Sequence, residues 1–157
     1  MGFLGHNWPP ARIFMGDVGS AFLGFSLAVL AVIGGLAHPG LPLAGLLVVW
    51  PFVFDTTFTI VRRLRRGENI FAAHRSHLYQ RVVIAGYSQR AVTLLYAGLA
   101  LLGVVLALAW VLALPGAGWL ALGLPGLLSL GLWRLVVRAE TKSLSAQGAT
   151  PTAGDSA

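Results

Sequence analysis

Residues 17–55 read DVGSAFLGFSLAVLAVIGGLAHPGLPLAGLLVVWPFVFD, and this stretch decides the fold. Between Asp17 and Asp55 it holds 37 consecutive residues without a Lys, Arg, Asp or Glu. A membrane-spanning helix needs roughly 20 predominantly apolar residues, so this stretch has room for two. A second uncharged stretch, of 43 residues, lies between Arg90 and Arg134. The sequence therefore predicts a membrane protein with about four spans.

Composition and breaker residues agree with this prediction. Of the 157 residues, 57% are hydrophobic and 10% are charged, against about 45 to 50% and about 25% in soluble domains. Glycines and prolines divide each uncharged stretch into two helices. We expect an all-α polytopic membrane helix bundle with spans near residues 18–36, 43–60, 91–114 and 119–137.

The cations predict the orientation of these spans, because Lys and Arg in short loops stay on the cytoplasmic side. All 11 lie before the first span, between the second and third, or after the fourth: Arg12; Arg62, Arg63, Arg65, Arg66, Arg75, Arg81 and Arg90; Arg134, Arg138 and Lys142. We therefore expect a cytoplasmic loop at 61–90, both termini in the cytoplasm and a disordered tail at 143–157. We attribute the net charge of +6 to cations that keep the loops on the cytoplasmic side and attract anionic membrane lipid, and not to a nucleic-acid binding surface.

Asp17 lies at the cytoplasmic entrance of the first predicted span, beside Gly16, Gly19 and Ser20. Asp is a preferred helix N-cap, and this structural interpretation explains the residue. Free amides at a helix start also favour anions, while a carboxylate can hold a divalent cation. The stretch thus also suits a Mg²⁺-bridged phosphate site, and local composition favours the N-cap.

Asp55 is a carboxylate inside the second predicted span, seven residues before Arg62. Ionisable groups within spans are expensive and are functional candidates by default. The structural alternative pairs Asp55 with an arginine of the 62–66 cluster, or with the hydroxyl of Thr56 or Thr57. The residues alone do not decide between the two.

The loop at 61–90 is long for a connection between helices, and its sequence NIFAAHRSHLYQR mixes apolar anchors with His and Arg. His74 and His77 are three residues apart, but without cysteine or a third histidine nearby a zinc site is disfavoured. Arginine forks pair with phosphate oxygens, and a histidine can donate a hydrogen bond or move a proton. The loop is therefore a candidate phosphate-binding segment.

Several of these motifs, in this order, resemble the C-terminal half of the polyprenyl-phosphate N-acetylhexosamine-1-phosphate transferases of glycosyltransferase family 4. They are IFMGDVGSAFLGF (13–25), PFVFD (51–55), RRLRRGENIF (62–71), HRSHLYQR (74–81) and AGYSQRA (85–91). The resemblance covers roughly residues 5–140. It implies a fragment, residues 1–142, of a larger membrane-embedded transferase domain in the bacterial inner membrane.

The resemblance also implies a reaction. A polyprenyl phosphate attacks the β-phosphate of a UDP-N-acetylhexosamine, with Mg²⁺ as cofactor, and undecaprenyl phosphate is the expected acceptor. The product would initiate O-antigen, capsule or another cell-envelope glycan. The implied site residues are Asp17 and His77 as catalytic residues, Asp17 also at the magnesium, and Gly19, Ser20, His74, Arg75 and Arg81 at the substrate phosphates.

The chain departs from the family pattern in two places. The loop motif, which carries three histidines in many members, reads HLYQ here and resembles a subgroup acting on deoxy-N-acetylhexosamines. An N-terminal half with an Asp-Asp pair and further metal-site residues is not present in this sequence. We therefore expect the chain alone to be inactive and interpret it as a fragment: a truncated gene, a start misassigned to Met1, or one half of a split enzyme. The expected protein partner is the missing N-terminal half or, as a homodimer, a second copy of the chain. The alternative is a non-catalytic four-helix membrane subunit or a transferase remnant.

Overall fold

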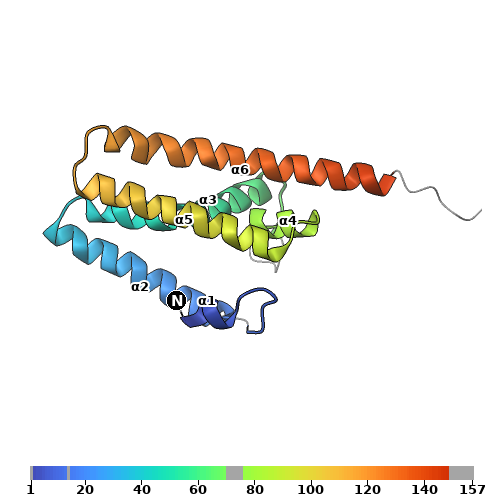
Figure 1. The fold of residues 1–157 in the computed structure, drawn as a ribbon, viewed down its shortest axis with the longest axis horizontal. Coiled ribbons are helices and arrows are strands. Elements are labelled where there is room, and N and C mark those ends of the chain that lie inside the picture. Colours follow the sequence, from blue (N-terminus) through green and yellow to red (C-terminus); the bar gives the residue numbers. More distant parts are fainter. Residues whose placement is uncertain (1, 14, 70–75, 149–157) are drawn as a thin grey trace, which may run out of the picture.

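The computed structural model describes residues 2–13, 15–69 and 76–148, and no strand occurs among them. The helices are α1 (Gly2–His6), α2 (Gly16–Ala37), α3 (Leu41–Arg65), α4 (Leu78–Ile84), α5 (Gln89–Val111) and α6 (Ala117–Gly148). Four of them, α2, α3, α5 and α6, are long and apolar enough to cross a membrane. Figure 1 shows these four running lengthwise along the molecule. The expected all-α bundle with four long apolar helices is confirmed.

Two of the long helices extend beyond the apolar segments that hydropathy marks. Helix α3 continues to Arg65 and so carries the arginines of the 62–65 segment as its last turn. Helix α6 contains Pro125 and continues to Gly148, six residues into the segment expected as a tail. Arginine, leucine and alanine are good helix formers, so a helix continues past the point where apolar character ends. Residues 149–157 lie outside the described part of the chain.

The connections between the helices follow from proline and glycine. Pro42 occupies the first turn of α3, where its missing N–H costs no hydrogen bond. The turn between α5 and α6 contains Gly116 with φ of 78° and Ala113 with φ of 50°, both left-handed. These short turns make α2 and α3, and α5 and α6, antiparallel neighbours. The first residues of α2 and α5 and the last residues of α3 therefore lie at one end of the bundle.

Helices α3 and α5 approach each other closely at a glycine. Pro51 lies inside α3, and because it has no N–H, the carbonyl of Leu47 four residues earlier loses its regular donor. That carbonyl faces Gly103 of α5, where an added Cβ would overlap it. Glycine is the residue that allows such an approach between two backbones.

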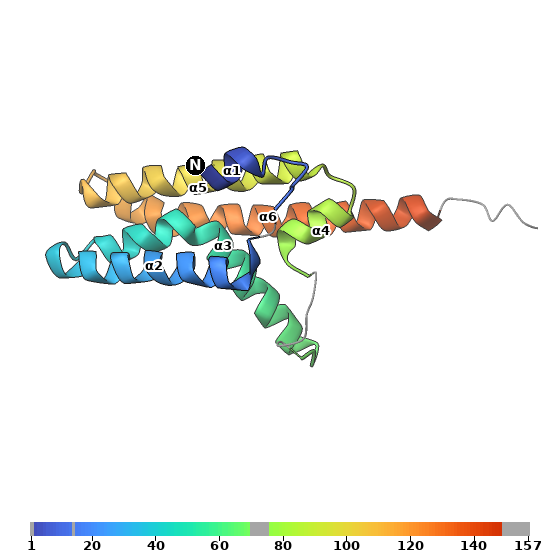
Figure 2. The same cartoon turned by 90° about the horizontal axis from the view of Figure 1, so that it is seen from below.

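A hydrophobic core lies where α4 meets α5 and α6. Leu78 and Val82 of α4 are buried against Val92 and Tyr96 of α5 and against Leu132 and Val136 of α6. Figure 2 shows α3 bending so that its C-terminal half points away from α5, with α4 on the side of that bend. A proline within a helix is the usual cause of such a kink. The bend thus leaves room for a short amphipathic helix at one end of the bundle.

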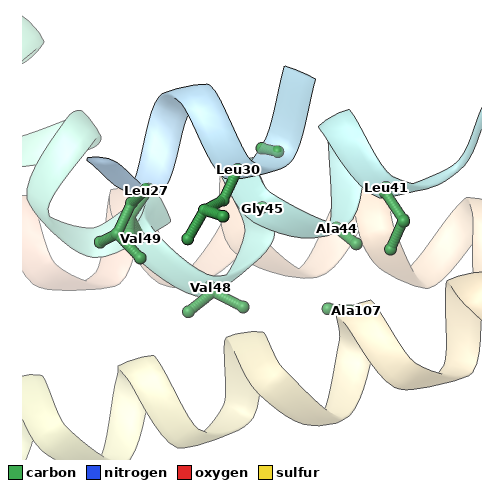
Figure 3. Close-up of a pocket in the computed structure, with 9 residues that line it drawn as sticks. Leu27, Leu30, Leu41, Ala44, Gly45, Val48, Val49 and Ala107 are labelled. Atoms are coloured by element: carbon green, nitrogen blue, oxygen red, sulfur yellow. The ribbon is translucent and has the colours of Figure 1, made fainter. Parts of the chain in front are cut away.

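Helix α2 packs differently, because none of its residues is buried. Among the described helices it contacts only α3. Between them and α5 lies an apolar groove of about 320 Å³, lined by Leu30, Val48, Ala107 and other aliphatic residues, and Figure 3 shows these side chains around it. No charged or hydroxyl side chain lines this groove, so it offers no chemistry for binding a phosphate.

Candidate functional site

Asp17 is the second residue of α2 and is exposed. The N-cap position is occupied by Met15, and no side chain caps the helix. The interpretation of Asp17 as the N-cap is therefore wrong, because the helix starts one residue before the aspartate. Its carboxylate lies in the first turn, where negative charge interacts favourably with the helix dipole. The group is thus not used for capping.

Gly19 and Ser20 follow Asp17 in the first turns of α2. The Ser20 hydroxyl donates a hydrogen bond to the Asp17 carbonyl oxygen at 3.1 Å. A Cβ at Gly19 would meet the flexible side chain of Met15 rather than backbone. The start of α2 is accordingly an open helix terminus with one carboxylate and one hydroxyl.

His77 lies at the N-cap position of α4, with extended backbone (φ −61°, ψ 149°). Its N–H donates to Oε1 of Gln80 at 3.3 Å. The imidazole stacks on Tyr79, with 5.8 Å between ring centroids and 21° between the planes, and 27% of the side chain is exposed. His77 is therefore held at a helix start with part of its ring accessible.

Asp55 is the polar centre of this end of the bundle, and its residue is only 3% exposed. Its Oδ1 accepts from the Leu78 N–H at 2.7 Å and from the Thr59 hydroxyl at 3.3 Å. Its Oδ2 accepts from the Tyr96 hydroxyl at 2.7 Å and from the Tyr79 N–H at 3.3 Å. A carboxylate of α3 thus satisfies the first free amides of α4, which have no carbonyl four residues earlier within the helix to accept their hydrogen bonds.

The same carboxylate lies next to His77, with Nδ1 of the imidazole 3.4 Å from Oδ1. The structural alternative, in which Asp55 pairs with an arginine of the 62–66 cluster or with Thr56 or Thr57, is wrong in the partners it names. Most of the observed partners of Asp55 lie far along the chain. Only Thr59, one helical turn from Asp55, could be anticipated from spacing.

The arginines of this end have different roles. Arg63 is buried, and its guanidinium donates to Oε2 of Glu68 at 3.1 Å and to the carbonyl of Asn69 at 2.6 Å, which fixes the chain after α3. Arg90 at the start of α5 donates to the carbonyl of Pro9 at 3.1 Å and so joins the segment before α2 to α5. Arg81 lies in the last turn of α4 and is partly buried. His74 and Arg75, expected at the substrate phosphates, lie outside the described residues.

Tyr79 completes the surroundings of His77. Burial, and then the negative charge of Asp55, raise the pKa of the Tyr79 phenol above its ordinary value, and the hydrogen bond with Gln80 lowers it in part. The phenol therefore stays neutral at physiological pH, and its ring packs against His77 without adding charge.

A second cavity, of about 610 Å³, lies between the C-terminal half of α3 and α6. It is lined by aromatic residues and by arginines: Phe54, Thr57, Phe58, Val61, Arg62, Arg65, Arg66 and Trp133. Neither this cavity nor the apolar groove at α2 is lined by Asp17 or His77. Asp17 and His77 thus lie outside both of these cavities.

The predicted residues therefore form two groups. Asp17, Gly19 and Ser20 begin α2, and His77 and Arg81 belong to α4 and its cap. Both groups lie at the end of the bundle where α3 ends and α5 begins, as Figure 2 shows. Helices α2 and α4 make no contact with each other. Among the described residues no group of three His, Asp or Glu side chains could enclose a metal ion.

Comparison with known proteins gives the context of these groups. Residues 1–35 match the model of the family described as glycosyl transferase family 4. A probable undecaprenyl-phosphate N-acetylglucosaminyl 1-phosphate transferase of Bacillus subtilis is 34% identical over 125 residues, which are 78% of this chain and 34% of that protein. The undecaprenyl-phosphate alpha-N-acetylglucosaminyl 1-phosphate transferase of Escherichia coli K12 is 32% identical over 67% of this chain and 29% of its own length.

A decaprenyl-phosphate N-acetylglucosaminephosphotransferase of Mycobacterium leprae is 34% identical over 60% of this chain and 27% of its own length. No solved structure matches. The chain spans about a third of the length of the curated relatives that it matches. On these matches the chain belongs to glycosyl transferase family 4 and corresponds to a part of the relatives, which are polyprenyl-phosphate N-acetylglucosamine-1-phosphate transferases by name.

Proposed function

We propose that this chain forms part of the catalytic region of an enzyme that transfers an N-acetylhexosamine-1-phosphate from a UDP-sugar to undecaprenyl phosphate. The observation that carries the proposal is the placement of two motif residues. Asp17 and His77 each lie at the start of a helix, at the same end of the bundle. The names of the relatives favour N-acetylglucosamine over a deoxy sugar as the transferred group.

The reaction requires two anionic substrates to meet. A phosphate oxygen of the lipid attacks the β-phosphorus of the UDP-sugar, a new P–O bond forms, the bond to the bridging oxygen breaks, and UMP leaves with that electron pair. Catalysis of such a transfer is mostly positioning and charge stabilisation. His77 with its partly accessible ring would contact the phosphates of the UDP-sugar, and nearby arginines would offset their charge.

This chain can supply one ligand of a magnesium site. Mg²⁺ commonly binds through one or two carboxylates together with substrate phosphates and water, and it neutralises charge on the phosphates when bound. Asp17 is exposed and free of capping, so it is the carboxylate we assign to the ion. Asp55 is not a further ligand, because it is almost completely buried and each of its oxygens already accepts two hydrogen bonds. We propose that the remaining ligands come from residues outside this chain.

We also propose a membrane orientation for this site. The ends of α2, α3 and α5 that hold Asp17, the 62–66 arginines and Arg90 would face the cytoplasm of a bacterium, since cations in short loops stay on that side. The chain has no cysteine, so single cysteines can be placed at the exposed positions Ser20 and Leu114. In sealed vesicles of known orientation, the thiol at position 20 should react only from the cytoplasmic side and the thiol at position 114 only from the other side. The reverse pattern, or labelling of both from the same side, would contradict this orientation.

A chimera tests the transferase activity. In it, the aligned segment of the Bacillus subtilis relative is replaced by the corresponding residues of this chain, and transfer from UDP-N-acetylglucosamine to undecaprenyl phosphate is measured in membranes. We expect the chimera to be active, and Asp17→Asn or His77→Ala to reduce turnover by about 100-fold or more. Arg65→Ala is the control and should change turnover little, because an exposed surface cation contributes little. Near-normal turnover of both variants would remove the assignment of these two residues.

A non-catalytic membrane subunit is the second candidate, and one observation favours it. Helices α2 and α4 do not contact each other, so within the described residues no direct contact between these two helices brings Asp17 and His77 into one site. The genomic sequence upstream of Met1 discriminates between the two functions. An in-frame or frameshifted extension with an Asp-Asp pair near the cytoplasmic end of a span supports the transferase, and its absence together with an inactive chimera supports the subunit.

A further inference from the structure

Asp55 occupies an unusual position for a carboxylate. It lies within a helix that is apolar enough to span a membrane, it is almost completely buried, and removing a charged group from water is costly unless it is fully hydrogen-bonded. Its hydrogen-bond partners lie at the same end of the bundle, and two of them are backbone amides of α4. The carboxylate is therefore used to hold α4.

The short length of α4 explains why it needs such a partner. Helix α4 has seven residues, and helices this short are unstable unless tertiary contacts support them. Its two first amides, of Leu78 and Tyr79, donate to Asp55, while Leu78 and Val82 are buried against α5 and α6. One carboxylate and one apolar face thus fix this helix to three long helices.

The histidine is fixed by the same group. His77 directly precedes α4, and its Nδ1 lies 3.4 Å from the carboxylate, while its ring stacks on Tyr79. The charge of the carboxylate beside Nδ1 favours the tautomer of a neutral imidazole that carries its proton on Nδ1 and leaves Nε2 as the acceptor. The backbone N–H of Gln80, which approaches the His77 side chain in the capping box, favours the opposite tautomer. We take the carboxylate to decide, because an interaction with an ionised group is stronger than one between neutral groups. Asp55 itself has no oxygen left for a substrate, so any effect that it has on catalysis passes through His77.

We propose that Asp55 is the positioning residue of the loop that carries His77: from helix α3 it fixes the start of α4 and keeps Nδ1 of His77 occupied, so that Nε2 is directed to the ligand. The first part of this inference stands on the contacts of the chain alone. The identity of the ligand as a sugar-nucleotide phosphate rests on the proposed function.

The experiment on α4 uses single-cysteine reporters, because the chain has no cysteine of its own. Val82→Cys places a thiol at a buried position of α4, and Ile84→Cys places one at an exposed position of the same helix. The labelling rate with a water-soluble maleimide is measured for the 157-residue chain in detergent micelles. Asp55→Leu should accelerate labelling at position 82 by at least about tenfold, since the buried amide of Leu78 and the partly buried amide of Tyr79 lose their acceptor, and should leave position 84 unchanged.

Two further variants grade the effect. Asp55→Asn keeps one acceptor oxygen and should give an intermediate rate, while Thr56→Ala, at the exposed neighbour of Asp55, is the matched control and should give the original rate. Equal protection of position 82 in the original chain and in Asp55→Leu would overturn the inference about α4.

The experiment on His77 uses its ¹⁵N chemical shifts, assigned with a His77→Gln variant and recorded above the titration range of free histidine. The original chain should show the Nδ1–H tautomer, and Asp55→Leu should shift the balance towards Nε2–H. Tyr96→Phe removes a donor from Asp55 but leaves the carboxylate beside His77, so it should keep the tautomer of the original chain. A tautomer balance that is insensitive to Asp55→Leu would overturn the positioning of His77.

These readouts do not require catalysis. Loss of protection and a changed tautomer in Asp55→Leu support the positioning role even if the chimera described above is inactive. An active chimera with unchanged protection and tautomer overturns the positioning role and leaves the proposed function intact.

Discussion

Helices α2 and α5 have nearly the same length and hydropathy, but they differ in how much of their surface is buried. They have 22 and 23 residues, and the most apolar 18-residue stretches of the two helices have similar hydropathy. None of the residues of α2 is buried, whereas α5 buries Val92, Tyr96, Gly103, Leu106 and Ala107. Hydropathy therefore says that both helices suit a membrane, and it does not say which of them builds the core.

The difference comes from a few positions of α5 that α2 lacks. Gly103 allows the backbone of α3 to come close, and Tyr96 carries a hydroxyl to the buried Asp55. Small residues at close approaches and polar groups with partners are what hold helices together when the surroundings are as apolar as the side chains. The polar residues of α2 that we propose to be functional, Asp17 and Ser20, lie in its first turns and are not buried.

A matched pair of leucines gives the largest expected difference between the two regions. Leu78 is fully buried in the cluster of α4, α5 and α6, and Leu36 at the end of α2 is 88% exposed. Leu78→Ala should lower the free energy of unfolding by about 2 to 5 kcal/mol, because it leaves a cavity in a packed core. Leu36→Ala should change it by less than about 0.5 kcal/mol. The measurement is denaturation with SDS in mixed micelles.

Equal losses in the two leucine variants would mean that α2 has packing partners of the same quality as α4. In that case the comparison between the two regions fails, and the exposed surface of α2 must be covered by a second copy or by another segment in the micelle.

A matched pair of glycines sharpens the comparison within the spans themselves. Gly103→Val would place side-chain atoms against the carbonyl of Leu47, while a Cβ at Gly24 of α2 meets nothing within 4 Å. Gly103→Val should therefore lower the free energy of unfolding by about 1 to 3 kcal/mol through overpacking. Gly24→Val should be close to neutral. The same SDS titration measures both, and a destabilisation by Gly24→Val as large as that by Gly103→Val would contradict the assigned interface of α3 and α5.

The fold was predictable because it depends on long uncharged stretches bounded by arginines, glycines and prolines. The ends of the helices were less predictable. Arg62 to Arg65 continue α3 because arginine favours a helix even where the chain has left the apolar segment. Helix α4 could not be found from periodicity, since seven residues give less than two full repeats of the helical pattern.

The candidate site was predictable only in its residue types. Asp17 and His77 stood out because a carboxylate and a histidine at the margins of apolar helices are uncommon and match family motifs. The partners of Asp55 were not predictable, because the Leu78 amide and the Tyr96 hydroxyl are 23 and 41 residues away in the chain. A backbone amide also leaves no trace in the sequence. The useful signals in retrospect are a buried acid, a threonine four residues later and one tyrosine in an otherwise apolar helix.

The smallest expected effect concerns the titration of Tyr79, which reports on the polar centre that α2 lacks. Burial, followed by the charge of Asp55, raises the pKa of this phenol, and the hydrogen bond with Gln80 lowers it. The folded state therefore holds the phenolic proton more tightly than the unfolded state. This contribution to stability is complete below the ordinary tyrosine pKa of about 10 and is lost as the pH rises through the folded value.

Two substitutions should move this titration in opposite directions. Asp55→Asn removes a negative charge and should lower the pKa of Tyr79, whereas Gln80→Leu removes the stabilising hydrogen bond and should raise it further. The difference in tyrosinate absorbance between each variant and the same variant with Tyr79→Phe isolates this phenol from the other tyrosines. A shift of the same sign in both variants would mean that general loosening of α4, and not the charge of Asp55, controls the surroundings of His77. Opposite signs would show that the carboxylate acts electrostatically on the very side chains that pack around the histidine, which no residue of α2 is in a position to do.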